Sequence, residues 1–173
     1  FALYANDGYR VTPYFIARVE DANRKVLEQA APDARAGAPA LSPEINFLMT
    51  SMMRDVIREG TGRAALELGR KDLAGKTGTT NEYRDAWFSG FNADLAATAW
   101  IGFDQPSSLG RGETGGRAAL PIWMDYMRVA LASVPEKPLV PPAGIVKLLV
   151  NSETGLPAAA GDRQAIEEYF IAG

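Results

Sequence analysis

The chain contains neither cysteine nor histidine among its 173 residues. Without cysteine it has no thiol nucleophile, no thiolate metal site and no internal disulfide. Without histidine, the Ser-His-Asp relay and the commonest zinc ligand are excluded. Acid–base chemistry must therefore use lysine, carboxylate or tyrosine groups, and we expect neither a metal nor a cofactor.

A strong net charge is also lacking. Eighteen Lys and Arg oppose 21 Asp and Glu, which gives a formal charge of −3. No basic field is available to hold a phosphate backbone, so we expect no nucleic-acid partner. No uninterrupted apolar run approaches the ~20 residues that span a bilayer, so we expect no membrane contact from this chain itself. An apolar fraction of 47% is ordinary for a globular domain.

Helix and strand signals alternate along the chain and predict an α+β domain, with an antiparallel sheet flanked by helices. A final helical turn is expected at residues 1–5, with Gly8 as a left-handed stop. Residues 30–40 are expected to form a surface loop. Strands or short extended elements are expected at residues 9–19, 25–28, 72–79, 85–91, 95–103, 145–150 and 166–171.

Two longer helices are predicted. The first has Ser42 as N-cap and Pro43 at its first position, and it ends at Gly60. We interpret its apolar stripe as core rather than as an adaptable binding surface; the stripe comprises Ile45, Leu48, Met49, Met52, Met53 and Val56. The buried face of the second helix is expected to comprise Ala119, Ile122, Trp123, Tyr126, Met127 and Ala130.

The motif with the clearest chemical meaning is Lys76-Thr77-Gly78, followed by Thr79. Lys-Thr-Gly is one of three signatures of enzymes that attack a peptide or β-lactam carbonyl with a serine. Side chains alternate along a strand, so Lys76 would lie on one face and the two threonine hydroxyls on the other. The ammonium could assist proton transfer, and Gly78 would let a peptide lie against the strand. The backbone N–H of Thr79 is a candidate oxyanion donor.

Neighbouring residues have less specific signals. Thr80, Asn81 and Tyr83 follow the motif and could line a cleft or form a solvated turn. Trp87 is more typical of a core residue than of a substrate platform. Glu113 lies in a glycine-rich stretch that is expected to shape a loop.

The other two signatures, Ser-x-x-Lys and Ser-x-Asn, do not occur in the 173 residues. Ser51 comes nearest to the first, but Arg54 stands where a lysine is required and an arginine cannot act as the base. We therefore expect the nucleophile on sequence outside this chain, and the chain alone to be inactive.

Long stretches of the chain resemble class A penicillin-binding proteins, in particular the penicillin-binding protein 1A group. The stretches that carry this resemblance are residues 69–81 (GRKDLAGKTGTTN), 83–88, 109–119 (LGRGETGGRAA), 121–123, 4–11, 13–14, 153–156 and 168–170. The resemblance implies the penicillin-binding protein and serine β-lactamase fold, of which this chain would be the C-terminal portion. Residues 1–133 would belong to the transpeptidase domain, and residues 134–173 would be a proline-rich strap and extension.

The resemblance also implies an activity. Such proteins are DD-transpeptidases that cross-link peptidoglycan stem peptides at D-Ala-D-Ala, and β-lactams acylate their serine. Carried over by position, Lys76 is catalytic, and Thr77, Gly78, Thr79 and Thr80 bind substrate. The implied partners are the remainder of the domain, with Ser-x-x-Lys and Ser-x-Asn, together with stem peptides and β-lactams.

Family members also carry a glycosyltransferase domain and a membrane anchor, and they work at the periplasmic face of the bacterial inner membrane. Two alternatives remain open from the sequence. The first is a DD-carboxypeptidase or serine β-lactamase, and the second is a non-catalytic domain that senses β-lactams or peptidoglycan. The residues upstream of Phe1 would discriminate between an acylating protein and a binding module.

Overall fold

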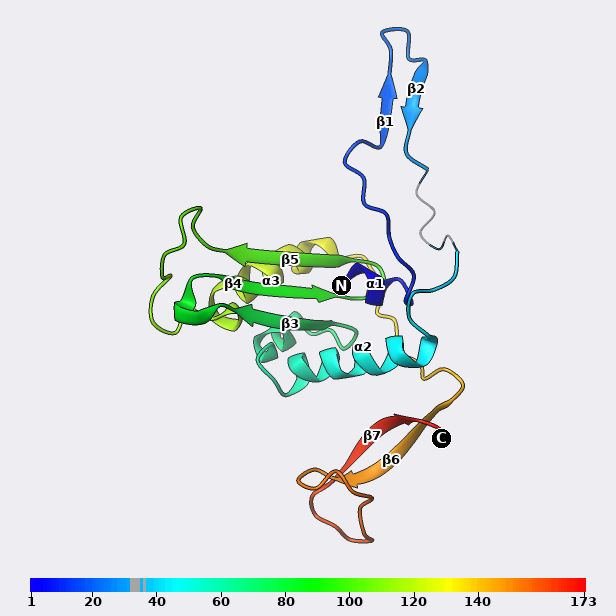
Figure 1. Ribbon diagram of the computed structural model, residues 1–173, viewed down its shortest axis with the longest axis vertical. Coiled ribbons are helices and arrows are strands. Elements are labelled where there is room, and N and C mark those ends of the chain that lie inside the picture. Colours follow the sequence, from blue (N-terminus) through cyan, green and yellow to red (C-terminus); the bar gives the residue numbers. More distant parts are fainter. Residues whose placement is uncertain (32–34, 36) are drawn as a thin grey trace.

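A computed structural model describes residues 1–31, 35 and 37–173 of the protein (Figure 1). Its centre is an antiparallel sheet with the strand order β3-β4-β5. The strands of this sheet are β3 (Ala74–Thr79), β4 (Ala86–Phe91) and β5 (Ala96–Ile101). Two hairpins extend away from the sheet in Figure 1; they are formed by β1 (Arg18–Glu20) with β2 (Val26–Gln29), and by β6 (Ile145–Asn151) with β7 (Ala165–Ile171). The predicted α+β class with an antiparallel sheet is confirmed.

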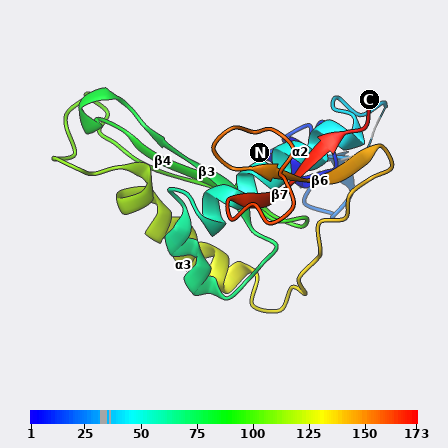
Figure 2. The same cartoon turned by 90° about the horizontal axis from the view of Figure 1, so that it is seen from below.

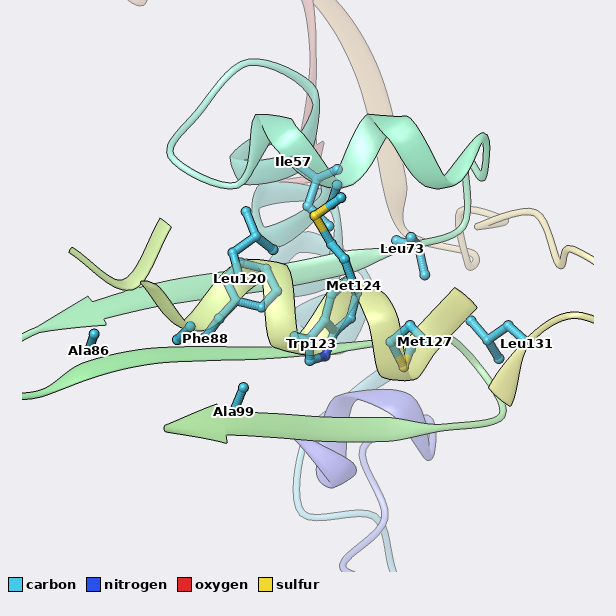
Figure 3. Packing of buried hydrophobic residues seen from close by; sticks show 12 residues of the cluster. Ile57, Leu73, Ala86, Phe88, Ala99, Leu120, Trp123, Met124, Met127 and Leu131 are labelled. Carbon is cyan, nitrogen blue, oxygen red and sulfur yellow. The ribbon is translucent and has the colours of Figure 1, made fainter. Parts of the chain in front are cut away.

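The helix α3 (Leu120–Ala130) covers one face of this sheet and forms the main core with it (Figure 3). Phe88 of β4 packs edge-on against Trp123, with ring centroids 4.9 Å apart. The Trp123 indole also donates to the carbonyl oxygen of Ala97 at 3.1 Å. This burial fixes the sheet on α3, because large aromatic side chains contribute most of the apolar area of a small core.

The buried face of α3 differs from the predicted one. Trp123 and Met127 are buried as expected, but Ile122 and Tyr126 are about half exposed. Leu120 and Met124 are buried in their place. Residues Gly115–Ala119 form a wider π-helical turn before α3, so an α-helical spacing counted from Ala119 does not apply to that turn.

The helix α2 (Pro43–Arg58) begins as predicted. The Ser42 side chain accepts a hydrogen bond from the Ile45 N–H, and Pro43 occupies the first turn. The predicted apolar stripe is only partly correct, because Ile45 and Met52 are exposed while Phe47 and Ile57 are buried. Phe47 has a separate packing partner, Tyr169 of the β6–β7 hairpin, at 4.9 Å between ring centroids, whereas Ile57 belongs to the core that α3 forms with the sheet. Figure 2 shows this hairpin lying alongside α2.

The N-terminal region agrees with the sequence at its start. The short helix α1 (Ala2–Ala5) is followed by Gly8 in the left-handed region, at φ 84°. The strand predicted over residues 9–19 is wrong for most of its length, since only Arg18–Glu20 is a strand. β2 is too short to pair with more, and the apolar side chains before β1 remain exposed. Residues 32–34 and 36 of the expected loop at 30–40 lie outside the described residues.

The segment after α3 is fastened to the beginning of β3 by a polar cluster. Arg70 and Asp72 form an ion pair at 2.7 Å, and both side chains are largely buried. Asn92 donates to Asp72 at 3.2 Å, and Arg70 donates to the carbonyl oxygen of Val134 at 2.7 Å. Within the part of the chain that the structure describes, no helix combines the length and apolar character needed to cross a membrane.

Candidate functional site at the edge of the sheet

Lys76 lies at the middle of β3, which is an edge strand among the described residues. Its side chain is exposed, and its Nζ donates to the carbonyl oxygen of Thr77 at 3.0 Å. No carboxylate in the described part of the chain forms an ion pair with it. An ammonium group has three donors, so Lys76 keeps two of them for other acceptors.

The hydroxyl groups of Thr77 and Thr79 lie on the opposite face of β3 from Lys76, as strand alternation requires. The Thr77 hydroxyl forms a hydrogen bond of 2.8 Å with the hydroxyl of Thr61, which follows α2. The Thr79 hydroxyl accepts from the N–H of Gly115 at 3.0 Å. Both hydroxyls are therefore oriented by protein partners, and each retains a further hydrogen-bonding capacity.

The backbone of β3 offers hydrogen-bonding groups at its outer edge. The Thr80 N–H donates to the Asp85 carbonyl oxygen at 3.1 Å, which fixes the phase of the antiparallel ladder. In such a ladder alternate residues point toward the partner strand. The N–H groups of Thr77 and Thr79 therefore point away from β4, where an extended peptide could pair with them.

A glycine-rich loop presses against β3 and β4 beside these threonines. A Cβ atom on Gly115 would lie 2.1 Å from the carbonyl oxygen of Trp87 and 2.6 Å from that of Gly78. Only glycine permits this approach of two backbones. Gly78 also lies close to its cross-strand neighbour, since a Cβ there would lie 3.2 Å from the Cβ of Trp87.

The residues expected beside the motif are distributed around the turn between β3 and β4. Thr80 and Asn81 are exposed, and Tyr83 is half-buried. Trp87 is not a core residue: it is 41% exposed and lies on the same face of the sheet as Lys76. Its indole is tilted against that of Trp100 on β5, with ring centroids 5.8 Å apart.

Four residues near the motif were not identified from the sequence, namely Thr61, Asp85, Trp100 and Gly115. The Gly-Gly pair in the loop before α3 was the only local signal for any of them. The Asp85 carboxylate accepts from the Trp100 indole N–H at 2.9 Å. Thr61 reaches β3 only because α2 packs beside that strand.

Charged groups stabilise the segment that leads into β3. Burial opposes ionisation of Asp72, but hydrogen bonds from Arg70 and Asn92 outweigh it and hold the pKa of that carboxyl below its ordinary value. The hydrogen bond between Arg70 and Asp72 also raises the pKa of the Arg70 guanidinium. Among the described residues, no cluster of three or more acidic side chains could hold a metal ion.

The two other sequence candidates lie apart from this arrangement. Ser51 is on α2 and lines a cavity of about 370 Å³ together with Met52 and residues of β7. Glu113 belongs to the loop before α3, and its N–H donates to the carbonyl oxygen of Gly110 at 3.3 Å. The geometry therefore concentrates interest on β3 and the turn that follows it.

Comparison with known sequences identifies the family of the chain. Residues 1–125 match the family of the penicillin binding protein transpeptidase domain. Penicillin-binding protein 1A of Pseudomonas aeruginosa is 40% identical over 98% of this chain, which spans 26% of that relative. Penicillin-binding protein 1A of Neisseria lactamica is 47% identical over 84% of the chain and 18% of its own length.

Solved structures agree with the sequences. The crystal structure of penicillin-binding protein 1A from Haemophilus influenzae superposes with a TM-score of 0.87 at 33% identity, covering 99% of this chain and 30% of that one. PonA1 from Mycobacterium tuberculosis gives a TM-score of 0.66 at 30% identity, covering 81% and 39% respectively. The resemblance to the penicillin-binding protein 1A group is confirmed, and the chain belongs to the family of penicillin-binding protein transpeptidase domains.

Proposed function

We propose that this chain forms one wall of the catalytic cleft of a peptidoglycan DD-transpeptidase. The observation that carries the proposal is the edge strand β3, which presents the exposed Lys76 ammonium and an outward-pointing Thr79 N–H. A positive charge and an unpaired backbone donor at a sheet edge suit the stabilisation of an oxyanion. Family membership supports the same reaction class.

The proposed reaction is acyl transfer in two steps. A serine oxygen attacks the carbonyl of the penultimate D-Ala of a stem peptide, and the terminal D-Ala leaves with a proton. An amine of a second stem peptide then attacks the ester, and the serine regains its proton. A β-lactam would acylate the same serine by opening of its ring.

Each residue of the motif has a role in this proposal. Lys76 would stabilise negative charge and assist proton transfer between hydroxyl and amine groups. Thr77 and Thr79 would bind the terminal carboxylate of the substrate, with the Thr77 hydroxyl oriented by Thr61. Thr80 would contribute to the substrate site by fixing the end of β3, because its hydroxyl already donates to the Asp85 carboxylate. The Thr79 N–H would share the oxyanion with the N–H of the serine, and Gly78 would leave room for the peptide backbone. Asn81, Tyr83 and Trp87 would line the cleft.

The proposal requires residues outside this chain, because Ser-x-x-Lys and Ser-x-Asn do not occur in it. We place them on the remainder of the same transpeptidase domain, as the partner of the β3 edge. We further propose that residues 1–133 belong to that domain, that residues 134–173 form a strap and extension, and that the parent protein is anchored at the periplasmic face of the inner membrane.

The test uses the complete protein and a synthetic stem pentapeptide. The proposal predicts release of D-Ala, a covalent adduct with a fluorescent penicillin, and a cross-linked product when an amine acceptor is added. D-Ala release without any cross-linked product would indicate a carboxypeptidase instead. Binding of penicillin without a covalent adduct would indicate a sensing domain, and either result would refute transpeptidation.

A further inference from the structure

The turn between β3 and β4 has an unfavourable backbone conformation. Glu82 and Tyr83 are consecutive residues in the left-handed region, at φ 61° and 54°. Residues with a side chain rarely adopt this conformation, and such strain persists only where surrounding contacts hold it in place. The contacts that hold this turn lie at the end of the Lys76 strand.

Thr80 and Asp85 close the turn with paired hydrogen bonds. The Thr80 N–H donates to the Asp85 carbonyl oxygen at 3.1 Å, and the Asp85 N–H donates to the Thr80 hydroxyl oxygen at 2.8 Å. The Thr80 hydroxyl in turn donates to one oxygen of the Asp85 carboxylate at 3.3 Å. Asp85 therefore fixes the Thr79–Thr80 peptide unit, which directly follows the unit that carries the Thr79 N–H.

The second oxygen of the same carboxylate reaches across the sheet to β5. It accepts from the Trp100 indole N–H at 2.9 Å. Gly102 makes this contact possible, because a Cβ there would lie 2.7 Å from that carboxylate oxygen and 2.4 Å from the Trp100 ring. Asp85 thus joins the two outer strands of the sheet through one side chain.

A second loop holds the opposite side of the turn. The Ser108 hydroxyl donates to the carbonyl oxygen of Glu82 at 2.9 Å, and the Leu109 N–H donates to that of Tyr83 at 2.8 Å. The carbonyl groups of both left-handed residues are therefore bonded. Asp85 therefore bonds to the start of the turn at Thr80, and the loop that contains Ser108 bonds to its two left-handed residues.

We propose that Asp85 is a positioning residue for acyl transfer: through Thr80 and Trp100 it sets the direction of the Thr79 N–H. This inference rests on the proposed function, in which that N–H stabilises the oxyanion. A donor of this kind must be aimed before the reaction begins, since its value depends on preorganisation. Asp85 acts at a distance from the reacting atoms and does not touch substrate.

The Asp85 carboxylate accepts from two donors in different directions, and its negative charge strengthens both bonds. An asparagine could keep the bond from the Trp100 N–H with its carbonyl oxygen, but its NH₂ group would then donate to the Thr80 hydroxyl oxygen instead of accepting from it. Asp85→Asn therefore removes the charge and reverses the bond with Thr80 while it preserves shape. Trp100→Phe removes the bond from the indole N–H and keeps an aromatic ring.

The experiment compares these variants in the complete, detergent-solubilised protein. Reaction with a fluorescent penicillin is followed over a range of concentrations, which separates non-covalent binding from the first-order acylation rate constant. The number of active sites is titrated in each preparation. Asp125→Asn is the matched control, because Asp125 is an exposed aspartate on α3.

We expect Asp85→Asn to lower the acylation rate constant about tenfold, with non-covalent affinity changed less than twofold and active sites unchanged. Trp100→Phe should act in the same direction, and the double variant should lose little more than either single variant. A rate constant equal to that of Asp125→Asn, or a loss only in the number of active sites, would overturn the inference. Absence of acylation in the unsubstituted protein would refute the proposed function itself.

Discussion

Lys76 carries the charge on which the proposed chemistry depends. Lys76→Ala in the complete protein is expected to lower the rate of acylation by penicillin by about a hundredfold or more, because the positive charge and a proton-transfer group are both lost. Lys76→Arg should restore only part of the rate, since a planar guanidinium cannot replace a compact ammonium. Stopped-flow labelling measures both rates. Unchanged acylation in Lys76→Ala would remove this residue from the mechanism.

Gly115 tests the close packing of the loop on the motif strand. A methyl group there would meet two backbone carbonyl oxygens that cannot move independently. Gly115→Ala should therefore lower the free energy of unfolding by about 3 kcal/mol. Gly69→Ala is the control, since no atom lies within 4 Å of its Cβ position and only its left-handed conformation is affected, at about 1 kcal/mol. Equal losses in urea unfolding of the two variants would contradict the packing described here.

The sequence predicted those residues of the candidate site that lie within or next to the Lys76–Thr79 motif. The alternation of Lys76 with Thr77 and Thr79 follows from the period of a strand and is observed. Thr61 and Trp100 reach the motif only through the packing of α2 and the pairing of β5, which no local pattern encodes. The exposure of Trp87 was mispredicted because aromatic composition does not tell which face of a sheet is covered.

At the scale of elements, the ion pair at the start of β3 predicts a pH dependence. The pKa of Asp72 is lower in the folded state than its ordinary value of 3.8. The stability that this carboxylate contributes is therefore present above that value and is lost as the pH falls through the lower, folded-state pKa. Urea unfolding measured from pH 7 down to about pH 3 follows this loss.

Asp72→Asn should lower the free energy of unfolding at pH 7 by about 3 kcal/mol, because it leaves a largely buried Arg70 without its partner. The dependence on pH should also become weaker in the acidic range. Asp125→Asn serves as the comparison, since that carboxylate is 77% exposed. If the two variants have the same free energy of unfolding at pH 7 and at pH 3, the Arg70–Asp72 ion pair does not anchor β3.

Helix starts were predicted better than helix faces. The N-cap at Ser42 depends on a few adjacent residues and was correct. The buried side of α2 depends on the β6–β7 hairpin, which follows more than eighty residues later and buries Phe47. The strand expected over residues 9–19 had suitable composition, but β-branched and aromatic residues form a strand only where a partner pairs with them.

At the scale of the whole molecule, the central sheet has two outer edges that no described strand pairs with, one on β3 and one on β5. An unpaired edge strand is usually paired with another strand or covered by a helix or loop. In the proposed function the β3 edge receives the substrate and the remaining motifs. Figure 1 shows the two hairpins extending from opposite ends of the molecule, with α2 beside β3.

The most direct measurement is the position of the acylated residue. The complete protein would be labelled with a penicillin, digested, and the modified peptide identified by mass spectrometry. The expected result is a serine outside the 173 residues of this sequence, with Lys76→Ala reducing the yield of that peptide. A labelled serine within these residues, such as Ser51, would contradict the assignment of β3 as a wall of a cleft whose nucleophile is supplied by another segment.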